Sequence, residues 1–480
     1  MSVPPVVVGW PTLSIGAHNA QEAASSIQNR SSVPYRSRTS VTGALGHTDG
    51  RTWGVKALIY SHGSRGDMQP YLALAYALNQ EGHSATLVGP RMYGSWVAEY
   101  GVDFAPVSDE AVKLHSRPDV REILVNNERT TDAYQKARER IFNEVFPTLY
   151  PVMLKEMWDA ASDGADIVLH SHSSRQAVHQ IAEKLGVPHV LASLYPHFVA
   201  SRRYPAQVGT FEERPDNLEQ HARANDNPIK GPLADLFARW RTEVLGLPPR
   251  DGFLDNRFRA DGTPAPVLHG FSPHVVEPAA DWPEWVHTTG FWMLPGTPGW
   301  RPSERLLRFL DDGEKPIFLG FGSHLGIDPE NTGRAVVEAV RRTGLRAVVV
   351  TGWGGVVIPD PPENILVEAE IPYDWLFPRV RAAVHPGGTG THNAALKAGI
   401  PQVICPFQKE GLMWANHLHE LGVAPAPVKH RELTADTLAA ALHRAVTDPD
   451  IARTVADLAE RTAPENGAEN AVRVIEKIAA

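Results

Sequence analysis

Short apolar runs alternate with helical patterns along most of this chain. The run at 55–60 is followed by a helical pattern at 71–80, and a second such series begins near residue 317. Further strands are expected at 85–88, 167–170, 346–350, 365–367 and 402–405. Strands that alternate with helices form parallel sheets, because each crossover helix packs on a face of the sheet. The sequence therefore predicts an α/β protein with two Rossmann-like domains.

Composition suggests where these domains begin and end. The 480 residues are enough for two or three domains, and the 42% hydrophobic content is enough for packed cores. Residues 1–53 are rich in Ser, Pro, Gly, Asn and Gln without a period, which predicts a disordered tail. Pro, Trp and Gly crowd into 276–304, a predicted linker. The domains are then 54–275 and 305–464, and 465–480 is expected to be a helix that packs back on the N-terminal domain.

A glycine-rich turn at 385–391 separates an apolar strand from a helix. Its glycines let the backbone approach a ligand, and the N-terminus of a helix offers unpaired N–H groups to an anion. A lone turn of this kind often only packs a helix onto a sheet. Here a second glycine turn at 320–323 follows another strand of the same half. Since ligands of open α/β sheets bind at the carboxyl ends of strands, the two turns predict a diphosphate site.

Several other classes of protein are disfavoured. A net charge of -9 does not suit a general nucleic-acid binder. Neither half has the dinucleotide motif G-x-G-x-x-G with a later acidic residue, and the P-loop motif is absent from the sequence. No apolar run approaches the roughly 20 residues of a membrane span, and the N-terminus lacks the basic region of a signal peptide. The single cysteine, Cys405, rules out an intrachain disulfide, and we expect a cytoplasmic location.

Three ordered motifs resemble one known family. Residues 371–391, together with 398–407, closely resemble the donor-binding signature of family-1 nucleotide-sugar glycosyltransferases, within them the sterol and antibiotic branch. Residues 63–70 (Gly-Ser-Arg-Gly-Asp-Met-Gln-Pro) resemble the first loop of that branch, and 320–323 resemble its second-domain loop. The resemblance covers about 55–480. It implies a GT-B fold, in which the acceptor binds mainly in the N-terminal half and the nucleotide sugar mainly in the C-terminal half.

The resemblance also implies a reaction. An inverting hexosyltransferase would move the sugar of a UDP- or TDP-sugar to a hydroxyl of a lipophilic or natural-product acceptor. A base takes the hydroxyl proton while N–H donors stabilise the departing diphosphate, so neither a metal nor a cofactor is required. The triplet 448–450 (Asp-Pro-Asp) is accordingly interpreted as a solvated turn. A non-catalytic homologue acting as partner or activator stays open, as does a GT-B epimerase acting on UDP-GlcNAc.

The resemblance assigns donor-binding roles to individual residues. Ser323, Gly388 and Thr391 would contact phosphate, backbone near Ile371 would hold the uracil or thymine edge, and Trp353 would stack on the base or pack in the core. The full set of expected donor-binding residues is Gly66, Gly322, Ser323, Trp353, Ile371, His385, Gly387, Gly388, Gly390, Thr391, Glu410 and Asn416.

Two positions depart from the family pattern. The second histidine of the usual His-His-Gly-Gly, a diphosphate ligand, is Pro386 here, while His385 either remains a ligand or is structural. The Asp-Gln pair that reads sugar hydroxyls in the family is replaced by Glu410 and Gly411. A carboxylate still accepts from hydroxyls, but glycine cannot replace glutamine. The sugar is therefore not assigned, and a deoxysugar or amino sugar is as compatible as glucose.

The identity of the base has three candidate answers. Relatives place a histidine in the first loop and an aspartate after a later strand, and these positions fall on Asp67 and His172 here. The resemblance therefore suggests a swapped dyad of Asp67 and His172. Asp67 acting alone and His62 are the alternatives. A purely structural role for Asp67, as the cap of a helix starting near Gln69, is also open.

Overall fold

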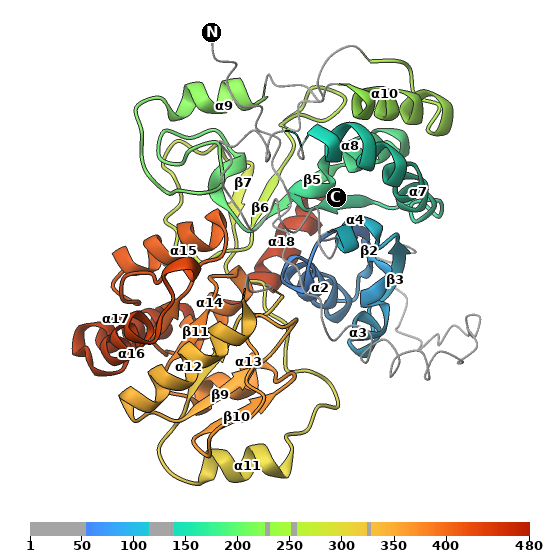
Figure 1. The fold of residues 1–480 in the computed structure, drawn as a ribbon. Coiled ribbons are helices and arrows are strands. Elements are labelled where there is room, and N and C mark those ends of the chain that lie inside the picture. The colour runs from blue at the N-terminus through green and yellow to red at the C-terminus, as the bar shows by residue number, and fades with distance from the viewer. Residues whose placement is uncertain (1–53, 115–135, 137–138, 226–230, 251–256, 324–327) are drawn as a thin grey trace, which may run out of the picture.

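The computed structural model describes residues 54–114, 136, 139–225, 231–250, 257–323 and 328–480. The expected tail at 1–53 lies outside these residues. The described chain forms two domains, each built on its own parallel sheet (Figure 1). Strand residues alternate between two cores, so that Ala57 and Ile59 face one apolar cluster while Leu58 and Tyr60 face another. Helices therefore cover both faces of the sheet, which confirms the predicted α/β architecture.

The N-terminal sheet has seven parallel strands in the order β3-β2-β1-β4-β5-β6-β7. They are β1 (Lys56–Tyr60), β2 (Ser84–Pro90), β3 (Asp103–Val107), β4 (Ile167–His170), β5 (His189–Ser193), β6 (Val267–His269) and β7 (Val286–Thr288). The last of these lies within 276–304, so this segment is more than the predicted linker. A three-residue strand among Trp and Pro residues is too short to produce a recognisable period.

Helices of the N-terminal domain are α2 (Arg65–Gln80), α3 (Gly94–Glu99), α4 (Glu110–Lys113), α7 (Phe146–Asp159), α8 (Arg175–Leu185), α9 (Asn217–Asn225) and α10 (Pro232–Arg239). Short 3-10 turns cover Arg91–Tyr93, His172–Ser174 and Pro196–Phe198, and π-turns cover Ile141–Val145 and Trp240–Val244. The helix α2 begins before Gln69, where we expected its start. Ser64 and Asp67 form a capping box that stabilises this earlier first turn.

The C-terminal sheet has the order β10-β9-β8-β11-β12. Its strands are β8 (Ile317–Gly320), β9 (Ala347–Val350), β10 (Ile365–Glu368), β11 (Ala383–His385) and β12 (Gln402–Ile404). The helices are α11 (Glu304–Asp311), α12 (Pro329–Thr343), α13 (Tyr373–Leu376), α14 (Thr389–Lys397), α15 (Lys409–Glu420), α16 (Ala435–Thr447) and α17 (Pro449–Thr462), with 3-10 turns at Phe377–Arg379 and His430–Glu432. None of the described helices is both long and apolar enough to cross a membrane.

The acidic triplet at 448–450 lies at the start of α17, where Asp448 caps the helix. The carboxylate of Asp448 caps α17 by accepting hydrogen bonds from the N–H groups of Asp450 and Ile451, at 3.0 and 3.4 Å. Among the described residues, no group of three or more His, Cys, Asp or Glu side chains is arranged to hold a metal ion.

The last helix, α18 (Gly467–Ala479), returns to the N-terminal domain and packs beside α2 (Figure 1). Its apolar face is buried in the same cluster as the core of α2. Asn470 donates to the carbonyl of Thr289 at 3.0 Å, and Ser272 donates to Glu465 at 2.6 Å. A Cβ on Gly467 would lie 2.4 Å from the backbone of Gly290, so the start of α18 packs against the segment after β7 with no room for a side chain.

Three histidines are buried together between β4, α8 and β5. The ring centroids of His179 and His189 are 4.5 Å apart, and those of His170 and His189 are 5.8 Å apart. Burial lowers the pKa of His170 to about 4 and that of His189 to about 2, and it also lowers the pKa of His179. All three rings are therefore neutral near pH 7.

This cluster makes folding stability sensitive to acid. An unfolded histidine has a pKa of about 6.5, so the unfolded state takes up protons first as the pH falls. We expect the full free energy of unfolding above about pH 6.5, where these histidines are neutral in both the folded and the unfolded state. It should then decrease towards pH 4, by up to about 1.4 kcal/mol per pH unit for each histidine. Denaturant unfolding at pH 7.5 and pH 5 measures this loss.

The matched variant is His189→Leu, because both His189 ring nitrogens are buried and have no hydrogen-bond partner among the described residues. We expect a smaller loss of stability between pH 7.5 and pH 5 in this variant. Equal losses in the variant and the parent chain would contradict the prediction.

Candidate active site

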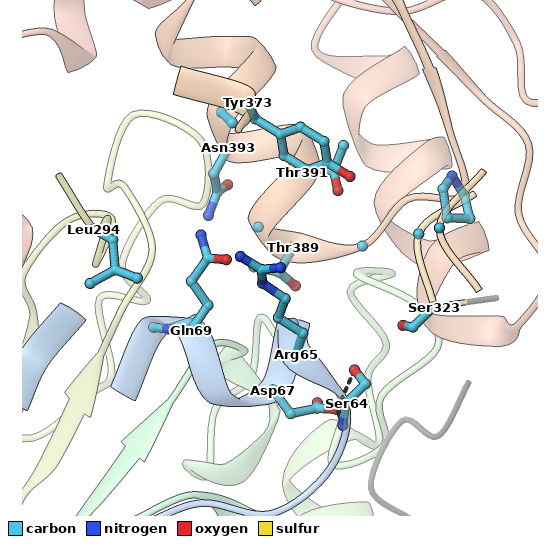
Figure 2. Close-up of a pocket in the computed structure, with 18 of the residues that line it drawn as sticks. Ser64, Arg65, Asp67, Gln69, Leu294, Ser323, Tyr373, Thr389, Thr391 and Asn393 are labelled. Atoms are coloured by element: carbon cyan, nitrogen blue, oxygen red, sulfur yellow. Dashed lines mark hydrogen bonds between the residues drawn. The ribbon is translucent and has the colours of Figure 1, made fainter. Parts of the chain in front are cut away.

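A cavity of about 360 Å³ lies between the two domains, at the carboxyl ends of both sheets. Figure 2 shows part of its lining, with α2 on one side and the first turn of α14 on the other. Ten of the twelve expected donor-binding residues line it: Gly66, Gly322, Ser323, Trp353, Ile371, Gly387, Gly388, Gly390, Thr391 and Glu410. The glycine turn and the first loop, 320 residues apart in sequence, thus face the same cavity.

The first turn of α14 presents polar groups that the protein does not use. Gly388 is the N-cap, so the N–H groups of Thr389 and Gly390 have no partner within the helix, whereas that of Thr391 donates to the Gly388 carbonyl. The side-chain oxygens of Thr389 and Asn393 are buried and have no hydrogen-bond partner among the described residues. These two side chains lie one turn apart on the helix face towards the cavity, and a buried unpaired oxygen is costly. The arrangement suits a ligand that carries hydroxyls and an anion.

The loops after β8 and β9 hold each other in place on the other wall. The Trp353 N–H donates to the carbonyl of Gly322 at 2.9 Å, and a Cβ on Gly352 would lie 2.3 Å from the same oxygen. Gly322 itself has φ +57°, which favours glycine. This packing fixes Ser323 and Trp353 at the edge of the cavity.

Two expected donor-binding residues do not line the cavity. His385 ends β11 with its ring buried, where Nδ1 accepts from the Gly387 N–H at 3.1 Å and Nε2 donates to Gln402 at 2.8 Å. Burial lowers its pKa to about 4, so the neutral ring shapes the turn from behind. Asn416 is exposed on α15, because six residues of helix rotate it by about 240° from Glu410.

The three candidate bases lie around one small cavity of about 20 Å³ that adjoins the larger one. Asp67 lines both cavities, while His62 and His172 line the small one. The Asp67 carboxylate accepts from the N–H and the hydroxyl of Ser64, at 2.7 and 2.8 Å. It therefore caps its own helix and also reaches the cavity.

His172 has a largely apolar environment. Its ring stacks on Phe198 with centroids 4.4 Å apart. Burial first, and then the positive charge of Arg175 and the neighbouring His170, lower its pKa to about 3. His172 is therefore a neutral and weakly basic ring that forms an apolar wall near Asp67.

Arg65 and Tyr195 were not predicted from the sequence. Arg65 is the only Lys, Arg or His side chain among the described residues that line the large cavity, which also has four acidic residues. Its guanidinium forms an ion pair with Glu370 of the other domain and lies 4.7 Å from the Trp96 ring centroid. Tyr195 of the N-terminal domain also contacts the C-terminal domain, because its hydroxyl donates to Glu410. Both contacts join segments far apart in sequence, so no local pattern indicates them.

Glu410 lies at the first turn of α15 and is half-buried. Burial, together with the negative charge of Asp67, raises its pKa well above the usual value. The two carboxyl groups, one from each domain, are therefore close enough to influence each other.

Thr389→Val tests whether the unpaired hydroxyl is kept for a ligand. Since the hydroxyl has no protein partner, we expect the ligand-free variant to gain roughly 1 kcal/mol in free energy of unfolding. Affinity for inorganic diphosphate should fall. Thr462→Val is the matched control, because the buried Thr462 hydroxyl lines neither cavity and donates to the Leu458 carbonyl at 2.9 Å, so its loss should destabilise the fold. Equal destabilisation by both variants, measured by thermal unfolding, would contradict this assignment.

Comparison with known proteins shows which family the chain resembles. Residues 58–202 match the glycosyltransferase family 28 N-terminal domain, and residues 354–478 match the C-terminal domain of erythromycin biosynthesis protein CIII-like proteins. The sterol 3-beta-glucosyltransferase of Candida albicans is 32% identical over 86% of this chain, and that of Komagataella phaffii is 31% identical over 88%. These alignments cover 27% and 34% of the two relatives, so the chain spans about a third or less of their length.

Solved structures show the same fold. The glycotransferase of kitacinnamycin superposes with a TM-score of 0.64 at 20% identity, covering 88% of this chain and 99% of that one. The glycosyltransferase VinC in complex with DTDP superposes with a TM-score of 0.60 at 20% identity, covering 88% and 99%. The sequence relationship and the two-domain GT-B fold together identify the chain as a member of the family-1-like GT-B glycosyltransferases.

Proposed function

We propose that the protein is an inverting, metal-independent hexosyltransferase that moves a sugar from a UDP- or TDP-sugar to a hydroxyl of a lipophilic acceptor. One observation carries the proposal: the unpaired polar groups at the start of α14 face the Asp67 carboxylate across a single cavity. An anion site opposite a carboxylate base suits the transfer of a group that departs with a diphosphate. The sterol 3-beta-glucosyltransferases among the relatives support the acceptor class, and the DTDP complex of VinC supports the donor class.

The donor would lie along the C-terminal wall. The base would stack near Trp353 with its edge at the backbone of Ile371, and the diphosphate would bind the N-terminus of α14. The buried oxygens of Thr389 and Asn393 would then find partners on the donor or its bound water. The sugar follows the diphosphate towards Asp67.

In this mechanism Asp67 is the catalytic base. The acceptor hydroxyl gives its proton to the Asp67 carboxylate, and its oxygen forms a bond to the anomeric carbon. The bond from that carbon to the diphosphate oxygen breaks on the opposite face, and its electron pair leaves with the diphosphate. The hydrogen bonds from Ser64 hold the carboxylate in place for this step. We assign His172 to the acceptor wall, because its ring is stacked on Phe198 and carries a lowered pKa.

The leaving group needs positive charge, and Pro386 cannot supply it. The N–H groups of α14 and the Arg65 guanidinium would take this role from opposite domains. Arg65 would exchange its contact with Glu370 for one with phosphate when the donor binds.

A second function deserves a test because Pro386 removes a family ligand from the turn. A homologue that only binds nucleotide sugars, as a partner or activator, would show binding without turnover. Thermal shifts with UDP, TDP and their glucose conjugates detect binding. Mass spectrometry of a reaction with a 3β-hydroxysterol detects transfer of the sugar. Release of UDP or TDP without a glycosylated product detects hydrolysis. No binding of either nucleotide would overturn both functions.

Asp67→Asn tests the base. The amide cannot accept the proton, so we expect transfer to slow by about 100-fold or more, while donor affinity changes less than about threefold. His172→Ala should slow transfer less than about tenfold if it only contacts the acceptor. Thermal unfolding checks that both variants fold. Near-normal transfer in both variants would exclude Asp67 and the dyad and would leave His62 as the remaining candidate.

Arg65→Gln tests the origin of the positive charge. Loss of a charged hydrogen bond should weaken UDP or TDP binding by about 10- to 100-fold in calorimetry. Glu370→Gln is the matched variant, because it removes the carboxylate that competes for Arg65 and should leave binding equal or tighter. If Arg65 only holds the domains together, both variants will weaken binding alike, which would contradict the assignment.

A further inference from the structure

The sugar of a bound donor has a restricted place in this cavity. It is joined to the diphosphate at the start of α14, and its anomeric carbon must face the acceptor near Asp67. Three residues, Asp67, Leu194 and Tyr195, line both the large cavity and the small one beside it. On the proposed function, the sugar would therefore lie where these three residues and the first turn of α15 meet.

Residue 411 cannot contribute a side chain here. A Cβ on Gly411 would lie 2.3 Å from the carbonyl oxygen of Pro386, and a Cβ on Gly387 would lie 2.8 Å from the Gly411 carbonyl oxygen. The turn and the first turn of α15 thus pack backbone against backbone. Pro386 and Gly411, the two departures from the family pattern, belong to a single contact. The side chain that remains on this wall is Glu410.

The partner of Glu410 comes from the other domain. Tyr195 donates its hydroxyl to Oε1 of Glu410, and no second hydrogen bond to this carboxyl occurs in the described part of the chain. The other carboxyl oxygen can therefore accept from a ligand hydroxyl in the cavity. An oriented carboxyl group that lines a cavity between an anion site and a base is suited to a polyhydroxylated ligand.

Tyr195 is held firmly enough to orient another group. Its N–H donates to the Ser193 hydroxyl at 3.1 Å, and this hydroxyl donates to the Tyr195 carbonyl at 2.8 Å. The Tyr195 ring is 8% exposed and packs on Trp414 with centroids 6.4 Å apart. Trp414 is one helical turn after Glu410, so a single face of α15 receives both the ring and the hydroxyl of Tyr195.

We propose that Tyr195 is a positioning residue for the donor sugar, which orients Glu410 to bind sugar hydroxyls and replaces the side chain that residue 411 cannot supply. This inference rests on the proposed function. It makes recognition of the sugar depend on closure of the two domains, because Glu410 and Tyr195 belong to different domains. The nucleoside diphosphate part of the donor, in contrast, binds without Tyr195.

Calorimetry with UDP, TDP, UDP-glucose, UDP-N-acetylglucosamine and TDP-glucose separates these two parts of the donor. For each sugar, the dissociation constant of the nucleoside diphosphate is divided by that of its nucleotide sugar. In Tyr195→Phe, which keeps the ring, we expect this ratio to fall by about 3- to 10-fold for the preferred sugar. Affinity for the diphosphate alone should change less than twofold, and the donor KM should rise while the acceptor KM stays constant.

Two further variants sharpen the test. Glu410→Gln should lower the same ratio, and the double variant should be no worse than the more affected single one, since both act on one contact. Tyr60→Phe is the control, because Tyr60 lines neither cavity and donates its hydroxyl to the Met157 carbonyl at 2.9 Å, so its ratio should match the parent chain.

The outcomes distinguish the inference from the proposed function. If the parent chain binds neither UDP nor TDP, the function fails and the inference fails with it. If nucleotides bind but the ratio of Tyr195→Phe equals that of the parent chain for every sugar, the function stands and the inference is overturned. Additive effects in the double variant would also overturn it.

Discussion

The arrangement of the cavity depends on one backbone contact, where the carbonyl of Pro386 lies against the Cα of Gly411. This contact joins the turn after β11 to the start of α15 and leaves no room for a side chain on either Gly387 or Gly411. From behind, His385 accepts the Gly387 N–H and holds the same turn. The N-terminus of α14 is thereby aimed at the cavity, and Glu410 becomes the side chain that faces it from α15.

The charges around the cavity bear on how an acidic protein would bind the diphosphate of the proposed donor. The described lining has four acidic residues and a single cation, Arg65, so net charge does not attract the ligand. Attraction would come from the oriented N–H groups at the start of α14 together with the Arg65 guanidinium. Arg65 and Tyr195 reach the C-terminal wall from the other domain, where they contact Glu370 and Glu410. On the proposed function, donor affinity and domain closure are linked through these two contacts.

Much of the fold was predictable because its signals are local. Apolar runs and glycine turns indicated two Rossmann-like domains, and the motifs indicated the GT-B family, both of which are confirmed. The short strand β7 was missed, since three residues carry no period. The start of α2 was placed too late, because the capping box of Ser64 and Asp67 starts the helix ahead of its apolar period. His385 and Asn416 were expected to bind the donor, but a motif does not reveal which way a side chain turns.

The sequence by itself determined the fold class, the family and the backbone segments that line the cavity, because helix starts, glycine turns and strand ends are encoded by neighbouring residues. Only the tertiary structure decided which side chains meet across the cavity. The contact of Tyr195 with Glu410 spans 215 residues, and that of Arg65 with Glu370 spans 305. Such contacts depend on how two domains pack, and α18 fixes that packing by returning from the C-terminal domain to α2. The local sequence contains no signal for this packing of the two domains.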